Sequence, residues 1–366
     1  MRTRRELLQG LGGVTIALIV SGCDPAPDKG KEGTTVPGKK ATEGGNGGKP
    51  IFAGIVMDVG GPDDKSFNAA ANLGLTRAIA ELKIDPKSKY LQSKSPADYK
   101  QNLTSFASQG ASVIIAVGFA MAEALKEVAP QFPGVKFVIV DAEAPKLPNA
   151  ASLHFKEEQG CFMAGYLAAS MSKTKTIGFV GGVEIPLIKK FEAGYKAGAK
   201  TADPAVQVKV TYTGDWDALD KGKSQADQLF ANGADIIFHA AGKAGLGVIR
   251  AAEAKGVGFY AIGVDQDQDA EAPGRVLTSM VKRVDVAVFD TIKAVQDGQF
   301  VAGERMYDIT KGGVGLSEMK YTKKDVPVAV MAKLDKIKAM LGATPPTIVA
   351  PTTLAEFDTF VVPKID

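Results

Sequence analysis

The sequence contains very little cysteine and histidine, with two of each among 366 residues. Zinc sites are commonly built from clusters of these residues, and Cys23, Cys161, His154 and His239 form no such cluster in the sequence. Two cysteines are also too few for a disulfide framework. Cys161 is predicted to be a small buried residue, because only the nearby His154 favours a nucleophilic role. We therefore expect neither a metal site nor a disulfide network.

Phosphate-binding motifs are missing as well. The glycine-rich segment GKAGLG (242–247) lacks the order GxxxxGK[ST] of a P-loop, and no GxGxxG follows a predicted strand. The adjacent acids Asp63 and Asp64 are of the type used in nucleoside hydrolysis, but no acidic cluster has metal-ligand spacing. The sequence predicts a protein that is not an enzyme and has no cofactor.

Neither an excess of charge nor a long hydrophobic run is present. The formal net charge is +3, and the basic residues form no stripe with interleaved aromatic residues. Such a stripe is the footprint of a nucleic-acid-binding surface, so no nucleic-acid partner is expected. The longest apolar segment, LLQGLGGVTIALIV (7–20), is too short and too rich in glycine to span a bilayer well.

That apolar segment instead has the features of an export signal. The basic stretch MRTRRE precedes it, as in secretory signal peptides, and its paired arginines resemble a twin-arginine signal. It ends in Val20-Ser21-Gly22-Cys23, which resembles a bacterial lipobox. We predict a signal peptide over 1–22 and lipidation of Cys23. The protein would then be anchored to the cell membrane, facing the periplasm or the cell exterior.

Residues 23–50 are rich in glycine, proline, lysine and threonine and nearly devoid of apolar side chains. A segment of this composition buries too little apolar surface to fold. It is predicted to be a disordered tether between the anchor and the folded part of the chain.

From Ile51 onward, short apolar runs alternate with amphipathic helical patterns. Strands are expected at 51–57, 112–118, 136–142, 176–182, 208–214, 235–241, 258–264 and 275–281. Helices are expected near 66–82, 98–109, 120–130, 160–172, 187–202, 220–232, 244–255 and 284–297. This alternation, with strands rich in valine and isoleucine, is typical of parallel sheets covered by helices on both faces. The predicted fold class is α/β.

An internal repeat divides the pattern into two halves. Residues 51–74 align without a gap to residues 175–198, so that Phe67 falls on Phe191 at an offset of 124. The segments QGASVIIAVG and FVIVDA recur as NGADIIFHAAG and YAIGVD at nearly the same offset. An offset shared by three elements favours a duplicated domain over chance.

Acidic residues follow three of the apolar runs, at Asp58, Asp141 and Asp265. Small molecules bind to open α/β sheets outside the carboxyl ends of the strands. We therefore predict that the two lobes face each other across a cleft that these acids line.

The segment after Asp58 contains the signals of a tight turn into a helix. Gly60-Gly61-Pro62 makes the turn, since glycine tolerates positive φ. Asp63, Asp64 or Ser66 is expected to cap the helix, and Phe67 to lie in its first turn near the cleft.

The segments DVGGPDDKSFN, GFVGGVEIPLIKKFEAGYKAG, DIIFHAAG, YAIGVDQDQ and VLTSMVKRVDVAV resemble the basic membrane protein family of bacterial lipoproteins. The resemblance covers roughly 51–316. It implies a type I periplasmic-binding-protein fold, with two doubly wound parallel-sheet lobes, a hinge and a central cleft. The lobes would comprise 51–153 with about 281–310, and 154–280 with about 311–366. The resemblance further implies capture of purine nucleosides and their delivery to an ABC permease.

The resemblance also implies a set of ligand-binding residues. Phe67 would stack on one face of the purine, and Phe238 or its rival Trp216 on the other. Base stacking is worth about 1–3 kcal/mol per face. The polar and backbone contacts implied are Asp141 at the base edge, Asp265 and Lys282 at the ribose, Asp58 and Asn68 in the lining, and Gly242 for close backbone approach. Lys243 departs from the small or uncharged residue expected there.

Two alternatives to nucleoside transport keep the same fold. The protein could signal to a membrane partner as a ligand-sensing receptor, or it could bind a sugar or another small polar solute. The sequence does not discriminate among these roles.

Overall fold

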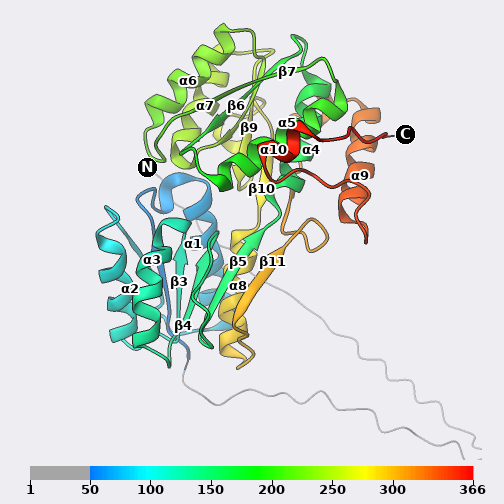
Figure 1. The fold of residues 1–366 in the computed structure, drawn as a ribbon. Helices are drawn as coiled ribbons and strands as arrows, with labels where there is room; N and C mark the ends of the chain where they lie inside the picture. The colour runs from blue at the N-terminus through cyan, green and yellow to red at the C-terminus, as the bar shows by residue number, and fades with distance from the viewer. Residues whose placement is uncertain (1–49, 366) are drawn as a thin grey trace, which may run out of the picture. The chain divides into compact units, whose positions relative to one another are not determined.

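Two sheets of six strands each form the centre of the structure, a computed structural model that describes residues 50–365 (Figure 1). The predicted signal peptide, Cys23 and residues 24–49 of the predicted tether lie outside the described residues.

The first sheet has the strand order β11-β5-β4-β3-β1-β2 and is parallel throughout. Its strands are β1 (Ala53–Met57), β2 (Lys89–Gln92), β3 (Val113–Val117), β4 (Lys136–Val140), β5 (Ala150–Phe155) and β11 (Gly303–Tyr307). One face packs against α1 (Phe67–Leu82) and α8 (Val284–Gln296), and the other against α2 (Asp98–Ser108) and α3 (Ala122–Val128). These elements are called the first lobe.

The second sheet has the order β12-β10-β9-β8-β6-β7, in which only β12 is antiparallel to its neighbour. Its strands are β6 (Thr176–Gly181), β7 (Gln207–Tyr212), β8 (Ile236–Ala240), β9 (Tyr260–Asp265), β10 (Val276–Lys282) and β12 (Val314–Leu316). One face packs against α4 (Glu157–Met171) and α5 (Pro186–Ala202), and the other against α6 (Leu219–Ala231) and α7 (Gly245–Lys255). These elements are called the second lobe, and α9 (Val328–Gly342) and α10 (Leu354–Asp358) pack against its helices α4 and α5.

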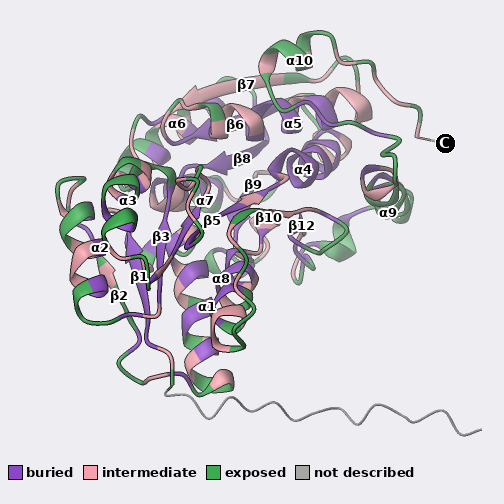
Figure 2. Cartoon of the chain, turned by 60° about the horizontal axis from the view of Figure 1, so that its bottom comes forward, coloured by how far each residue is buried: buried purple, intermediate pink, exposed green. Residues whose placement is uncertain are grey.

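The two sheets confirm the predicted repeat, because equivalent strands occur in the same order in both. Asp141 directly follows β4, Asp265 ends the equivalent strand β9, and both have φ of 64°. This left-handed backbone is uncommon outside glycine, and Asp tolerates it better than most residues. The central strands β3 and β8 are buried on both faces (Figure 2).

The chain passes between the two lobes three times, after β5, after β10 and after β11. Three crossings side by side make a hinge region about which lobes can rotate. That the lobes move as two bodies, 51–153 with about 281–310 and 154–280 with about 311–366, remains a prediction. Cys161 is fully buried and free, as expected.

Candidate functional site

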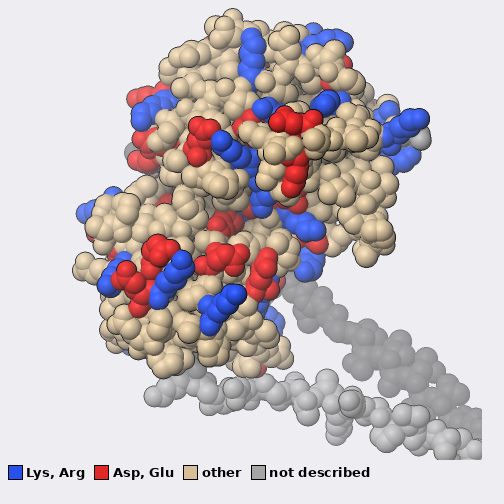
Figure 3. Space-filling model, viewed as in Figure 1, with Lys and Arg blue, Asp and Glu red and all other residues tan. Residues whose placement is uncertain are grey.

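A cavity lies between the two lobes at the carboxyl ends of the strands, and both lobes line it. Parallel strands end at one edge of a sheet, so residues distant in the sequence meet there. All but one of the residues predicted to bind ligand lie in its wall: Asp58, Phe67, Asn68, Asp141, Trp216, Gly242, Asp265 and Lys282. On the face shown in Figure 3, acidic and basic side chains gather where the lobes meet.

The start of α1 is fixed by a buried carboxylate. Asp64 accepts hydrogen bonds from the backbone N–H groups of Ser66, Asn68 and Ala69 at 2.8–3.0 Å. It is the capping residue among the three candidates from the sequence. The preceding turn has Gly61 at φ 64°, as the glycine pair predicted.

Asn68 is oriented by two acids of the cavity wall. Its Nδ2 donates to Asp58 Oδ1 at 2.8 Å and to Asp64 Oδ2 at 3.0 Å. These bonds turn Oδ1 of Asn68 away from the two acids, and this buried oxygen has no partner within the described residues. Burial, partly offset by the bond from Asn68, raises the pKa of Asp58 to about 6.

Lys282, the last residue of β10, forms two ion pairs beneath the cavity. Its Nζ lies 2.6 Å from Asp141 Oδ2 and 2.8 Å from Glu157 Oε1, and Glu157 also pairs with Lys190. Burial alone would lower the pKa of Lys282, but the carboxylates of Asp141, Glu157 and Asp265 reverse that effect and raise it. The ammonium is therefore charged.

Aromatic rings complete the surroundings of this ammonium. The Lys282 Nζ lies 5.3 Å from the centre of the Phe67 ring, 5.0 Å from that of Phe155 and 5.7 Å from that of Phe191. Cation–π attraction is stronger when the cation is desolvated, as it is here. In the Asp141–Lys282 pair, one carboxylate oxygen is left over: buried Asp141 Oδ1 has no hydrogen-bond partner within the described residues.

Two hydrogen bonds join the lobes in addition to that of Lys282 with Asp141. Ser66 Oγ of the first lobe donates to Asp265 Oδ2 of the second. The side-chain amide of Gln268 donates to the carbonyl of Lys65 at 2.9 Å. Burial raises the pKa of Asp265 to about 7 against the opposing effects of Lys282 and Ser66.

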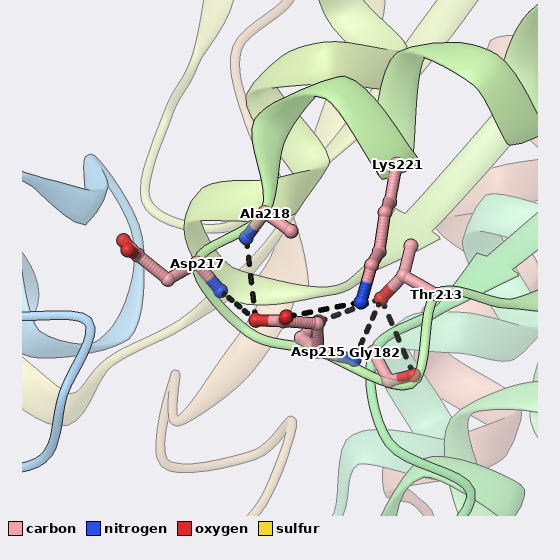
Figure 4. Close-up of polar contacts among 6 residues, drawn as sticks. All are labelled: Gly182, Thr213, Asp215, Asp217, Ala218 and Lys221. Atoms are coloured by element: carbon pink, nitrogen blue, oxygen red, sulfur yellow. Dashed lines mark hydrogen bonds and ion pairs between the residues drawn. The ribbon is translucent and has the colours of Figure 1, made fainter. Parts of the chain in front are cut away.

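Trp216 lies on the loop 213–218, which Asp215 folds onto itself (Figure 4). Asp215 Oδ1 accepts the N–H groups of Asp217 at 2.9 Å and Ala218 at 3.3 Å, and Thr213 Oγ1 donates to the Asp215 carbonyl at 2.6 Å. The indole packs over Gly182, where any side chain would overlap the ring. The loop is thus built to present Trp216 to the cavity.

Phe238 is the predicted residue that does not line the cavity. It lies in the middle of β8, fully buried, with its ring 5.6 Å from that of Phe179 and 5.2 Å from that of Tyr195. Trp216, its rival, lines the cavity from the second lobe. Phe191, the repeat equivalent of Phe67, is both buried and part of the cavity wall.

Several residues of the site were not predicted to bind ligand. Asp64 and Phe119 line the cavity, and Glu157 supports Lys282 from below. The internal repeat could have indicated Phe119. Phe119 follows Gly118 in the first half as Lys243 follows Gly242 in the second, and all four residues line the cavity. No comparable signal marked Glu157.

Within residues 50–365, no three His, Cys, Asp or Glu side chains are grouped to hold a metal ion. The helices of the same range include none with the length and hydropathy needed to cross a membrane.

Comparison with known proteins identifies the family. The family model described as "Bmp: ABC transporter substrate-binding protein PnrA-like" matches residues 51–343. The chain belongs to this family. Its members are substrate-binding proteins of ABC transporters and not enzymes, so the predictions of family, of type I binding-protein fold and of a non-enzyme are confirmed.

Individual Bmp relatives cover most of the chain. The "CD4+ T-cell-stimulating antigen" of Listeria monocytogenes is 36% identical over 310 residues, which are 79% of this chain and 85% of the relative. The "ABC transporter nucleoside-binding protein BmpA" of Lactococcus lactis is 34% identical over 78% of this chain and 87% of its own length. Among solved structures, an ABC transporter solute-binding protein from Aeropyrum pernix superposes with a TM-score of 0.75 at 29% identity. It covers 85% of this chain and 96% of that one.

Proposed function

We propose that this Bmp-family chain is a membrane-anchored extracytoplasmic lipoprotein that captures purine nucleosides, namely guanosine, inosine or adenosine, and delivers them to an ABC permease. The observation that carries the proposal is a cavity between two lobes with an aromatic side chain from each lobe and buried acceptors that have no partner among residues 50–365. The name of the Lactococcus relative, a nucleoside-binding protein, supports the same ligand class.

The aromatic residues suit a flat heterocycle. Phe67 comes from the first turn of α1 in the first lobe, and Trp216 from the loop 213–218 in the second. A purine base stacked between them gains about 1–3 kcal/mol per face, whether it is guanine, adenine or hypoxanthine. Stacking therefore supplies affinity, and the polar groups supply discrimination.

The polar groups offer acceptors and one donor. Asp141 Oδ1 and Asn68 Oδ1 are buried acceptors without a partner in the described part of the chain, and buried polar atoms in native proteins are nearly always bonded. An ammonium has three N–H donors; Lys282 donates one to Asp141 and forms an ion pair with Glu157. We assign Asp141 to the N–H groups at the base edge, and Lys282 and Asp265 to the ribose hydroxyls. Asp58 would complete the lining, and Gly242 would allow close backbone approach.

Capture by closure follows from the division of these groups between lobes. A ligand that contacts Phe67 and Trp216 together is bound fully only when the lobes meet, so it favours the closed state. The contacts of Ser66 with Asp265 and of Lys65 with Gln268 would hold that state. The permease would recognise the closed form.

Isothermal titration tests the ligand class. Guanosine, adenosine and inosine are titrated into the protein alongside ribose and a free purine base. We expect binding of the nucleosides and weaker binding of the base, because buried groups that meet ribose would be left unpaired. Binding of ribose without any nucleoside would overturn the proposal, as would co-purification of an unrelated solute identified by mass spectrometry.

The anchor is tested separately, since Cys23 lies outside the described residues. Cys23→Ser is expected to abolish incorporation of labelled lipid and to release the protein from the membrane fraction. Retention of Cys23→Ser in that fraction would refute the lipid anchor and leave the ligand proposal intact.

A further inference from the structure

The cavity contains more carboxylates than cations, and its cations are already paired. Among the described lining residues, the acids are Asp58, Asp64, Asp141 and Asp265, and the cations are Lys243 and Lys282. Lys282 is bonded to Asp141 and Glu157, and Lys243 forms an ion pair of 2.7 Å with Asp217. An anionic ligand would therefore meet no lysine that lacks a carboxylate partner.

The Asp217–Lys243 pair lies at the rim of the cavity. Its side chains are 50% and 36% exposed, whereas that of Lys282 is 2% exposed. Figure 4 shows the Asp217 side chain pointing away from the hydrogen-bonded group around Asp215. The negative charge of Asp217 also reaches the opposite lobe: burial is the main cause of the raised pKa of Asp58, and Asp64 and Asp217 add to it.

The backbone holds both members of the pair in position. The N–H of Asp217 donates to Asp215 Oδ1 at 2.9 Å, which fixes its place on the loop 213–218. Lys243 lies in the short helical turn η4 (Gly242–Ala244), and the N–H of Ala244 donates to the Trp216 carbonyl at 3.0 Å. The pair is thus a fixed feature of the wall that presents Trp216.

We propose that the Asp217–Lys243 ion pair is a charge filter that selects uncharged nucleosides against their phosphorylated forms. Asp217 occupies the rim ammonium that a phosphate would otherwise bond, and it adds a negative charge facing the first lobe. This inference rests on the proposed function, because it concerns which form of a nucleoside the same cavity accepts. Charged groups across a binding surface discriminate strongly in this way, since like charges brought together cost several kcal/mol.

The test compares guanosine with guanosine 5′-monophosphate by isothermal titration on the full chain. We expect the wild-type protein to bind guanosine about 100-fold more tightly or better. Asp217→Asn frees Lys243 and should reduce the ratio of the two dissociation constants, monophosphate to guanosine, by about tenfold. Lys243→Met leaves Asp217 unneutralised and should widen the ratio. In the double variant, the freed ammonium is gone, so the preference for guanosine over the monophosphate should return most of the way to the wild-type value.

Asp227→Asn is the matched control. Asp227 pairs with Lys223 at 2.7 Å on α6, both side chains are 40% exposed, and neither lines the cavity. Its nucleoside-to-nucleotide ratio should equal that of the wild type.

The two single variants move the ratio in opposite directions only if the pair filters charge, whereas general damage to the rim would weaken both ligands together. An unchanged ratio in Asp217→Asn, with guanosine still bound, overturns the filter and leaves the proposed function standing. A wild-type protein that binds no nucleoside overturns the proposed function and this inference with it.

Discussion

Lys282 and Asp141 form a buried ion pair of 2.6 Å that joins the two sheets, because Lys282 ends β10 in the second sheet and Asp141 follows β4 in the first. The two side chains are only 2% and 5% exposed. Such a pair adds little stability by itself, but the removal of one partner leaves an uncompensated buried charge. The arrangement therefore makes Lys282 more important for stability than an exposed lysine.

Lys282→Met should lower the free energy of unfolding by about 3–5 kcal/mol, because buried Asp141 loses its cation and Glu157 is left with Lys190 alone. Denaturant unfolding measures the change. Lys243→Met is the control, since it breaks a half-exposed pair that should contribute about 1 kcal/mol or less. Equal losses in the two variants would contradict the buried charge of Lys282.

Asp265→Asn should change stability in a pH-dependent way. The pKa of Asp265 in the folded protein is about 7, above its ordinary value of 3.8, because burial disfavours the charged form. The folded state therefore binds the proton more tightly than the unfolded chain. The stability contributed by Asp265 is fully present below about pH 4 and is lost as the pH rises towards 7.

Asparagine does not titrate, so the stability of Asp265→Asn relative to the wild type should increase as the pH is raised from 5 to 8. One pKa unit corresponds to about 1.4 kcal/mol, so the gain should exceed roughly 1 kcal/mol. Urea unfolding at the two pH values measures it. Asp58 and Glu158, whose pKa values burial raises to about 6 and about 7, remain in both proteins and cancel. A difference that does not vary with pH would refute the raised pKa.

Phe67→Ala should weaken purine nucleoside binding by about 1–3 kcal/mol, the value of one stacking face. Phe238→Leu is the matched aromatic control: Phe238 is packed in the core, so its replacement should lower stability without a comparable loss of affinity. Titration calorimetry and thermal unfolding separate the two effects. A larger loss of affinity in Phe238→Leu than in Phe67→Ala would show that the ligand lies elsewhere.

The contrast between these two phenylalanines shows what the sequence could predict about the site. Asp58, Asp141 and Asp265 were predictable because parallel strands direct the residues at their carboxyl ends to one edge. Phe238 was predicted to bind ligand but lies outside the cavity wall, because it is the third residue of β8, a strand buried on both faces. In such a strand no alternation of polar and apolar residues distinguishes the wall of a cavity from the core.

The residues that support Lys282 were harder to predict. Glu157 begins α4, separated from the end of β5 by one residue, and β5 was not among the predicted strands. The edge strands β2, β11 and β12 were also missed. β2 and β11 carry polar residues and β12 has only three residues, so none of them gives a strong pattern. The internal repeat nevertheless predicted the two-lobed architecture, because an offset shared by distant segments does not depend on detecting every strand.

Gly182→Ala should displace Trp216, because an added methyl group would overlap the indole ring. Trp216 is the only tryptophan in the chain, so intrinsic fluorescence reports its surroundings directly. We expect a shifted emission maximum together with weaker nucleoside binding. Gly134→Ala is the control, since a methyl group there meets no atom within 4 Å. An unshifted spectrum with normal affinity would show that the ring does not depend on Gly182.

Gln268 links three elements through one side chain. Its Oε1 accepts the N–H of Val264 at 3.0 Å and lies 3.0 Å from His239 Nε2, while its Nε2 donates to the Lys65 carbonyl of the first lobe. Burial lowers the pKa of His239 to about 4, so the ring is neutral near pH 7. A neutral ring that donates from Nε2 fixes the orientation of the Gln268 amide, which leaves its NH₂ group directed at the first lobe.

Gln268→Glu should therefore act on lobe closure. Glutamate can keep the acceptor for Val264, but it places a second oxygen against the Lys65 carbonyl in place of a donor. We expect nucleoside affinity to fall by about tenfold, equivalent to about 1.4 kcal/mol. Small-angle scattering at saturating nucleoside should show a larger radius of gyration than the wild type. Gln225→Glu is the control, because Gln225 accepts from Thr211 at 2.6 Å within the second lobe alone. Normal affinity and full compaction in Gln268→Glu would mean that ligand contacts hold the lobes together without this bond.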